Sequence, residues 1–161
     1  MNPSSIVCQP HRLRTARSIA GAILLLVMQV SVAHAVDPVY ENWRGLAIRG
    51  TDPVAYFTEG KPVPGSSDFA TEWNGSTWRF ASAANRTAFL KEPKRYAPQY
   101  GGYCAWAVSQ GYTASTDPNA WKIVDAKLYL NYSKEVQKKW AADIPGLVAA
   151  ADEYWPGLLV D

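Results

Sequence analysis

The sequence has few side chains that bind soft metals, and almost all of them lie at its beginning. Both histidines, both methionines and one of the two cysteines fall within the first 35 residues. Residues 36–161 keep one thiol, Cys104, and contain no imidazole or thioether. Zinc and copper sites normally use several such ligands. The sequence after residue 35 therefore has no complete zinc or copper site, and a single cysteine excludes an internal disulfide.

The first 35 residues have the three parts of a signal peptide in the expected order. A basic region contains Arg12, Arg14 and Arg17, and an apolar run extends from Ile19 to Val30. The small residues of Ala33-His34-Ala35 then suit a signal peptidase. We expect cleavage after Ala35 and a periplasmic or secreted protein. Because the arginines do not form an adjacent pair, general secretion is favoured over the twin-arginine route.

A retained membrane anchor is the alternative interpretation of this segment. A spanning helix needs about 20 predominantly apolar residues. Gln29, Ser31 and His34 interrupt the apolar run before that length is reached. We therefore expect no stable membrane insertion after cleavage, and a domain that comprises residues 36–161.

The composition of residues 36–161 excludes some classes of partner. Removing residues 1–35 takes away three arginines and no acidic residue, so the 16 Lys and Arg become 13 against 14 Asp and Glu. The resulting charge of −1 gives no indication of a nucleic-acid or anionic-membrane surface. All 7 Trp, 9 Tyr and 4 Phe lie in this part. They can supply the core of one domain without a disulfide.

The first half of the domain has mainly strand signals. Leu46 to Phe57 alternates loosely between apolar and polar residues, with Asp52-Pro53 as a turn or strand start. Phe69–Trp73 and Ser76–Ala81 flank Asn74-Gly75, which favours a two-residue hairpin turn. A second hairpin is expected further along, with strands at 121–124 and 128–132 around a turn at 125–127.

Helices are expected between and after the two hairpins. Ser82 can cap a short helix that runs through Lys91 and is closed by Pro93. Ser133 can cap another, and Asp143 with Pro145 can open a third that ends at Pro156-Gly157. Together the patterns predict a single α+β domain with small antiparallel hairpins, short helices and a helical C-terminus.

The order of several motifs is similar to that of a known family. The motifs are Asp52-Pro53-Val54, Trp78-x-Phe80-x-Ser82, Phe89, Pro93-x-x-Tyr96, Tyr100-Gly101-Gly102-Tyr103-Cys104-Ala105 and Asn131-Tyr132-Ser133. The chain resembles the YHS domain, in particular the secreted stand-alone YHS-domain proteins of bacteria. The resemblance covers roughly residues 45–158.

The resemblance implies a metal-associated family, but the metal ligands are missing here. Relatives commonly have Cys after Asp-Pro-Val, Cys at the end of the aromatic hairpin, and Cys or His one helical turn later. The matching positions in this chain are Ala55, Ala81 and Asn85. None of them is a strong ligand for a soft or borderline metal. Whether any cofactor is bound is left open by the sequence.

Cys104 has two interpretations. If a helix begins near Tyr103, the thiol lies close to unpaired N–H groups that favour a thiolate, and Cys104 becomes a nucleophile, a redox group or a lone metal ligand. Alternatively, Cys104 is a small apolar residue in the core, as free cysteines often are. We favour the second, because no acid or base is identifiable beside it.

We predict a binding or accessory module rather than an enzyme. Its ligand-binding candidates are Tyr100, Tyr103, Cys104 and Tyr112, and its expected partner is a small ligand or another envelope protein. A thiol-dependent enzyme or redox partner that uses Cys104 is the first alternative. A protein-interaction module with an aromatic surface is the second.

Overall fold

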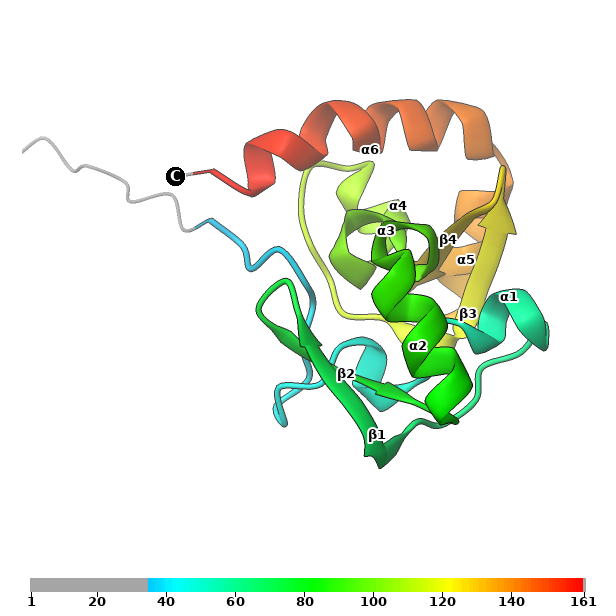
Figure 1. Ribbon diagram of the computed structural model, residues 1–161. Helices are drawn as coiled ribbons and strands as arrows, with labels where there is room; N and C mark the ends of the chain where they lie inside the picture. Colours follow the sequence, from blue (N-terminus) through cyan, green and yellow to red (C-terminus); the bar gives the residue numbers. More distant parts are fainter. Residues whose placement is uncertain (1–34, 161) are drawn as a thin grey trace, which may run out of the picture. The chain divides into compact units, whose positions relative to one another are not determined.

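The computed structural model describes residues 35–160 (Figure 1). The predicted signal peptide, residues 1–35, lies outside the described residues except for Ala35. Within the described part of the chain, no helix is long and apolar enough to cross a membrane.

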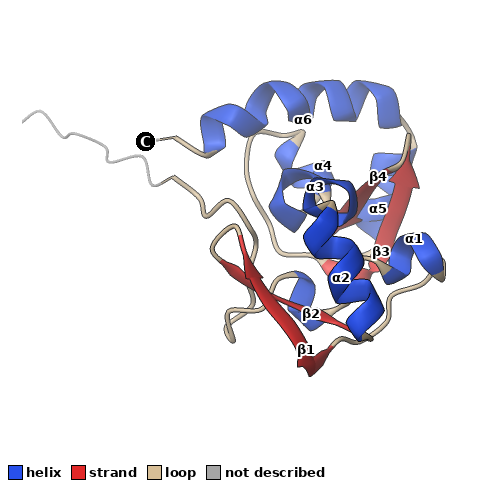
Figure 2. Cartoon of the chain, viewed as in Figure 1, coloured by secondary structure: helices blue, strands red, loops and turns tan. Residues whose placement is uncertain are grey.

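The described residues have a mixed α+β architecture, as predicted, with two separate antiparallel hairpins (Figure 2). The first pairs β1 (Ser66–Trp73) with β2 (Ser76–Phe80), and the second pairs β3 (Asp117–Val124) with β4 (Lys127–Asn131). The helices are α1 (Ala55–Thr58), α2 (Ala83–Lys91), α3 (Pro93–Tyr96), α4 (Ala105–Val108), α5 (Lys134–Ala141) and α6 (Ile144–Leu158), with 3-10 turns η1 (Ile48–Gly50) and η2 (Gln99–Gly102).

Both hairpins turn on two residues with positive φ. Asn74 has φ 51° and Gly75 has φ 84°, which confirms the turn predicted from this dipeptide. Asp125 (φ 49°) and Ala126 (φ 59°) make the corresponding turn of the second hairpin. That turn therefore uses the same left-handed backbone without a glycine.

Polar side chains cap the N-termini of the longer helices, as predicted. The Ser82 hydroxyl accepts from the N–H of Asn85 (3.1 Å) at the start of α2, and Ser133 caps α5 in the same way. Asp143 accepts from Gly146 N–H (3.1 Å) at the start of α6. The predicted end of α6 is wrong, because the helix passes through Pro156 and continues to Leu158.

The strand-like alternation of residues 46–57 does not produce a strand. Ile48, Arg49 and Gly50 all have positive φ, which breaks an extended chain. Asp52 then bends the chain into α1, because its Oδ1 accepts from the N–H groups of Val54 (2.8 Å) and Ala55 (3.3 Å). The hydrogen bonds to the Asp52 carboxylate therefore determine the backbone conformation here, and the alternating sequence pattern does not.

The core has two parts, and strand β4 contributes side chains to both. The first contains Trp78 and Phe80 of β2, Phe89 of α2, and Leu128 and Leu130 of β4. The second lies beneath α6 and contains Tyr100, Val108, Tyr129, Trp140 and Ala151. Full burial of each large apolar side chain contributes about 1.5–3 kcal/mol.

Candidate ligand-binding site

Three segments that are distant in the sequence enclose an aromatic cleft of about 190 Å³. They are the chain at residues 35–41, the turn of the β1–β2 hairpin and the end of α6, which lie near one another in Figure 1. Pro98 and Gly101 also line it. We call this space the aromatic cleft; its lining residues are Pro38, Val39, Trp73, Asn74, Trp78, Ala97, Pro98, Gly101, Trp155 and Leu159.

The N-terminal wall of the aromatic cleft is held by backbone hydrogen bonds at both ends. Val36 N–H donates to the carbonyl of Leu158 (3.0 Å), and Tyr40 N–H donates to the carbonyl of Gly101 (2.9 Å). Gly101 has φ +59°, and a Cβ there would lie 2.0 Å from the Pro38 carbonyl oxygen. Only glycine fits this position, so the Gly101 of the sequence motif shapes the cleft.

Three tryptophans contribute to the lining. Trp78 is fully buried and its indole N–H donates to the carbonyl of Trp73 (2.9 Å). The Trp73 and Trp78 rings meet edge to face with centroids 5.6 Å apart. Trp155 comes from α6 and is half-buried. The cleft therefore has indole walls from three different elements, β1, β2 and α6.

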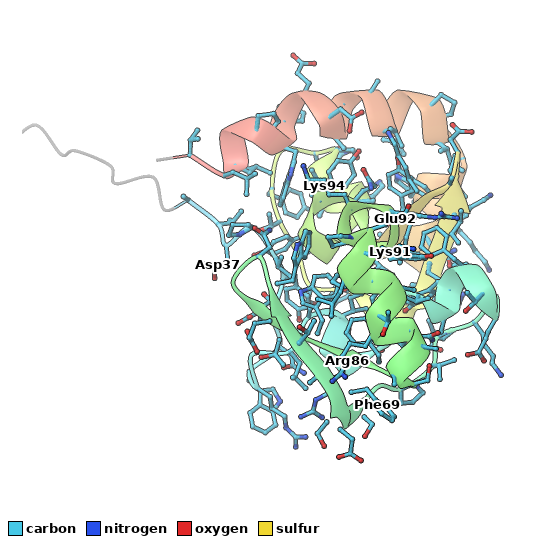
Figure 3. The ribbon with its side chains drawn as sticks, in the orientation of Figure 1. Asp37, Phe69, Arg86, Lys91, Glu92 and Lys94 are labelled. Atoms are coloured by element: carbon cyan, nitrogen blue, oxygen red, sulfur yellow. The ribbon has the colours of Figure 1, made fainter. Side chains whose placement is uncertain are left out.

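A second hollow, of about 130 Å³, adjoins the aromatic cleft and is acidic. It shares Pro38, Val39 and Asn74 with the cleft, and it adds the carboxylates of Asp37 and Glu41. We call it the acidic hollow. Figure 3 shows Asp37 beside the turn of the β1–β2 hairpin. Neither carboxylate forms an ion pair with a described residue.

Two of the predicted site residues lie directly behind the cleft. The rings of Tyr100 and Tyr103 each lie 5.9 Å, centroid to centroid, from the ring of Trp155. The Tyr100 hydroxyl donates a hydrogen bond to Asp152 Oδ1 (2.8 Å). This bond links η2 to α6. Burial, followed by this hydrogen bond, raises the pKa of Tyr100. These tyrosines support Trp155 rather than line the cleft.

Tyr112 lies elsewhere. Its side chain is exposed and meets the ring of Trp106 edge-on, with centroids 6.5 Å apart. It does not contribute to the aromatic cleft or to the acidic hollow. The structure therefore does not bring the four predicted candidates into one site.

Cys104 is buried, with 1% of its surface exposed. It precedes α4, and its sulfur accepts from the N–H of Tyr132 (3.3 Å) and lies 3.8 Å from Asn131 Oδ1. The N–H groups expected near the thiol are present, but burial is the stronger effect and raises its pKa. A buried, protonated thiol is a poor nucleophile. The geometry favours the core interpretation of Cys104.

The positions that correspond to family metal ligands surround the carboxylate of Asp52. This carboxylate is fully buried, and its Oδ1 already accepts from the N–H of Ala55. Its Oδ2 accepts from the N–H of Ala81 (2.8 Å) and from Asn85 Nδ2 (2.7 Å). This one side chain therefore joins residues 52–55 to residues 81–85.

The residues around Asp52 do not fit a soft or borderline metal. Asp52 supplies hard oxygen atoms that already accept four N–H groups, and no thiolate or imidazole accompanies them. Within residues 35–160, no group of three or more His, Cys, Asp or Glu side chains is placed to hold a metal ion. The residues at positions 55, 81 and 85 instead donate hydrogen bonds to the carboxylate of Asp52.

Sequence reasoning did not identify the cleft residues. The tryptophans as a group were expected to supply the core of the domain, and Asp37 and Glu41 belong to a short segment before the expected domain core. Two signals were available: the paired glycines at 101–102, and the concentration of tryptophan in so small a domain.

Comparison with known families agrees with the motif order. Residues 54–100 match the model of the YHS domain, which confirms the predicted resemblance for this segment. The segment supplies five lining residues of the aromatic cleft, from Trp73 to Pro98. No curated protein and no solved structure matches the chain. The extension of the resemblance to residue 158 stays a prediction.

Proposed function

We propose that the protein is an exported binding module that takes up a small ligand in the aromatic cleft. The observation that carries this proposal is the cleft itself, a concave space with indole walls and few polar groups. Binding sites for small molecules have this general character. A space of about 190 Å³ suits a compound smaller than a typical drug.

Export follows from the pattern of residues 1–35. We propose that the chain is cleaved after Ala35 and acts in the periplasm or outside the cell. The new N-terminus would be Val36, whose nitrogen lies 3.0 Å from the carbonyl of Leu158 at the end of α6. A positive charge is favourable at a helix C-terminus. Cleavage at this point is therefore compatible with the observed fold.

An accessory role through thiol chemistry has less support, since Cys104 is buried and its pKa is raised. A metal-dependent role is not supported by the residues around Asp52. The proposal therefore rests on non-covalent binding of an organic ligand.

Mass spectrometry of small molecules that co-purify with the protein tests the proposal. Protein produced from the full sequence and isolated from the cell envelope is compared with its Trp155→Leu variant, after circular dichroism has shown that both are folded. Trp43→Leu, at an indole that is 86% exposed, is the matched control. We expect a compound retained by wild type and Trp43→Leu and lost from Trp155→Leu. Equal retention by all three, or none by any, contradicts the proposal.

A further inference from the structure

The aromatic cleft and the acidic hollow share lining residues, so a ligand at their border can contact both. Pro38, Val39 and Asn74 form the shared border. On one side stand the indole rings of Trp73 and Trp155, and on the other stand Asp37 and Glu41. A ligand that spans the border meets an apolar aromatic wall and two negative charges.

The charged side chains that line the combined site are of one sign. Its lining contains two carboxylates and no Lys, Arg or His. Figure 3 shows the labelled cations Arg86, Lys91 and Lys94 on α2 and α3, apart from Asp37. An anionic ligand would be repelled, and the indole N–H of Trp78 is not free to attract one because it is bonded to Trp73. The site is suited to a cation.

The influence of the carboxylates extends to the aromatic residues behind Trp155. The pKa of Tyr103 is raised by burial and then by the charges of Asp37, Tyr40 and Glu41. The Tyr103 ring lies 5.5 Å from that of Tyr40 and 5.9 Å from that of Trp155. The two carboxylates therefore lie close enough to influence a ring that contacts Trp155.

We propose that this combined site binds a small organic cation with a methylated ammonium group, of the choline type. Such a group carries a positive charge inside an apolar shell, so it is attracted both by tryptophan rings and by carboxylates. A bare metal ion or an unmethylated ammonium group is strongly hydrated and gains less from an indole wall. This inference rests on the proposed function, since it names the ligand class for the same cleft.

Calorimetric titration with a pair of matched compounds tests the charge requirement. Choline is compared with 3,3-dimethyl-1-butanol, which has the same shape but carbon in place of the charged nitrogen, and with glucose as a neutral polar ligand. Protein produced from the full sequence is used. We expect one-to-one binding of choline, and binding of the neutral analogue weaker by about tenfold or more.

Substitutions at the two carboxylates test the location. Asp37→Asn and Glu41→Gln keep size and remove charge at the surface, so the fold is retained. Each should weaken choline binding by about threefold or more. Asp125→Asn, at an exposed carboxylate in the β3–β4 turn, is the matched control and should leave binding unchanged.

The other outcomes overturn the inference in distinguishable ways. Equal binding of choline and its neutral analogue, or binding of glucose alone, shows that the ligand class is wrong while the aromatic cleft remains a binding site. Choline binding that Asp37→Asn and Glu41→Gln leave unchanged shows that the location is wrong. If no compound binds, the inference fails, and the mass spectrometry of the co-purified ligand then decides independently whether the proposed function also fails.

Discussion

Gly101 and Pro38 are packed so closely that no side chain fits between them. A Cβ on Gly101 would lie 2.0 Å from the carbonyl oxygen of Pro38, and the neighbouring Tyr40 N–H donates to the Gly101 carbonyl. This contact fixes the chain at residues 36–40 against η2. The N-terminal wall of the aromatic cleft depends on it.

Gly101→Ala should destabilise the protein and weaken ligand binding. The new methyl group must displace Pro38, and alanine at φ +59° is itself unfavourable, so the expected loss is about 2–5 kcal/mol. Chemical denaturation measures it. Gly60→Ala is the control, because Gly60 has φ +66° but no atom within 4 Å of a new Cβ. Equal losses for the two variants would show that the contact with Pro38 is unimportant.

Asp52→Asn should be among the single substitutions that most destabilise the first part of the core. One carboxylate oxygen becomes an NH₂ group that faces N–H donors, either those of Val54 and Ala55 or those of Ala81 and Asn85. A buried polar group left without its partners costs about 1–3 kcal/mol, and more for a charged one. Thermal unfolding measures the loss. Asp68→Asn, at an exposed carboxylate of β1, should change stability by less than about 0.5 kcal/mol. A melting temperature for Asp52→Asn equal to that of the control would contradict the role assigned to Asp52.

Cys104 should react slowly with a thiol reagent in the folded protein and rapidly in denaturant. The sulfur is buried and burial raises its pKa, so little thiolate is present at neutral pH. Cys104→Ser should cost about 1–3 kcal/mol, because a hydroxyl replaces a weakly polar group in the core. Fast labelling of the native protein, with an unchanged melting temperature for the serine variant, would instead favour the thiol hypothesis.

The raised pKa of Cys104 also predicts a dependence on pH. At a pH below 9.0, the ordinary pKa of a thiol, Cys104 is protonated in both the folded and unfolded states. Its full contribution to stability is then present. As the pH rises further, the unfolded thiol ionises first and stability is lost. The difference in unfolding free energy between wild type and Cys104→Ala should therefore shrink from about pH 7 to about pH 10. A difference that stays constant or grows would mean that the thiol is not held in its neutral form.

Tyr100→Phe should loosen α6. The variant removes the hydrogen bond from the tyrosine hydroxyl to Asp152 Oδ1, at a cost of about 1 kcal/mol. Hydrogen exchange of the amides in Ile144–Leu158 should become faster. Tyr132→Phe is the control, since Tyr132 is 56% exposed. Unchanged exchange in α6 for Tyr100→Phe would show that other contacts hold the helix.

The sequence correctly predicted the first hairpin turn and the helix starts, which depend on side chains within a few residues. Asn74-Gly75 specified the first turn, and Ser82, Ser133 and Asp143 specified helix starts, because each acts on backbone within a few residues of itself. The segment 46–57 was misjudged because its conformation depends on Asp52, whose carboxylate also bonds to Ala81 and Asn85, far along the chain. Helix α6 continues past Pro156 because a proline in its last turn interrupts few hydrogen bonds.

The candidate site could be predicted only in part. Tyr100 and Tyr103 were identified, and both touch Trp155, but the walls of the cleft come from residues more than a hundred positions apart in the sequence, such as Pro38 and Trp155. Periodicity and motif spacing report neighbours in sequence. They do not show that Asp37 lies beside the turn at Asn74.

The most direct test of the account is to observe which tryptophans respond to the ligand. The seven indole N–H resonances are assigned by single substitution and followed by NMR during titration with choline. We predict that the Trp73, Trp78 and Trp155 signals shift and saturate together, while those of Trp43, Trp106, Trp121 and Trp140 remain in place. Saturating shifts confined to the latter group, or no saturating shift in any indole, would contradict a choline-type site in the aromatic cleft.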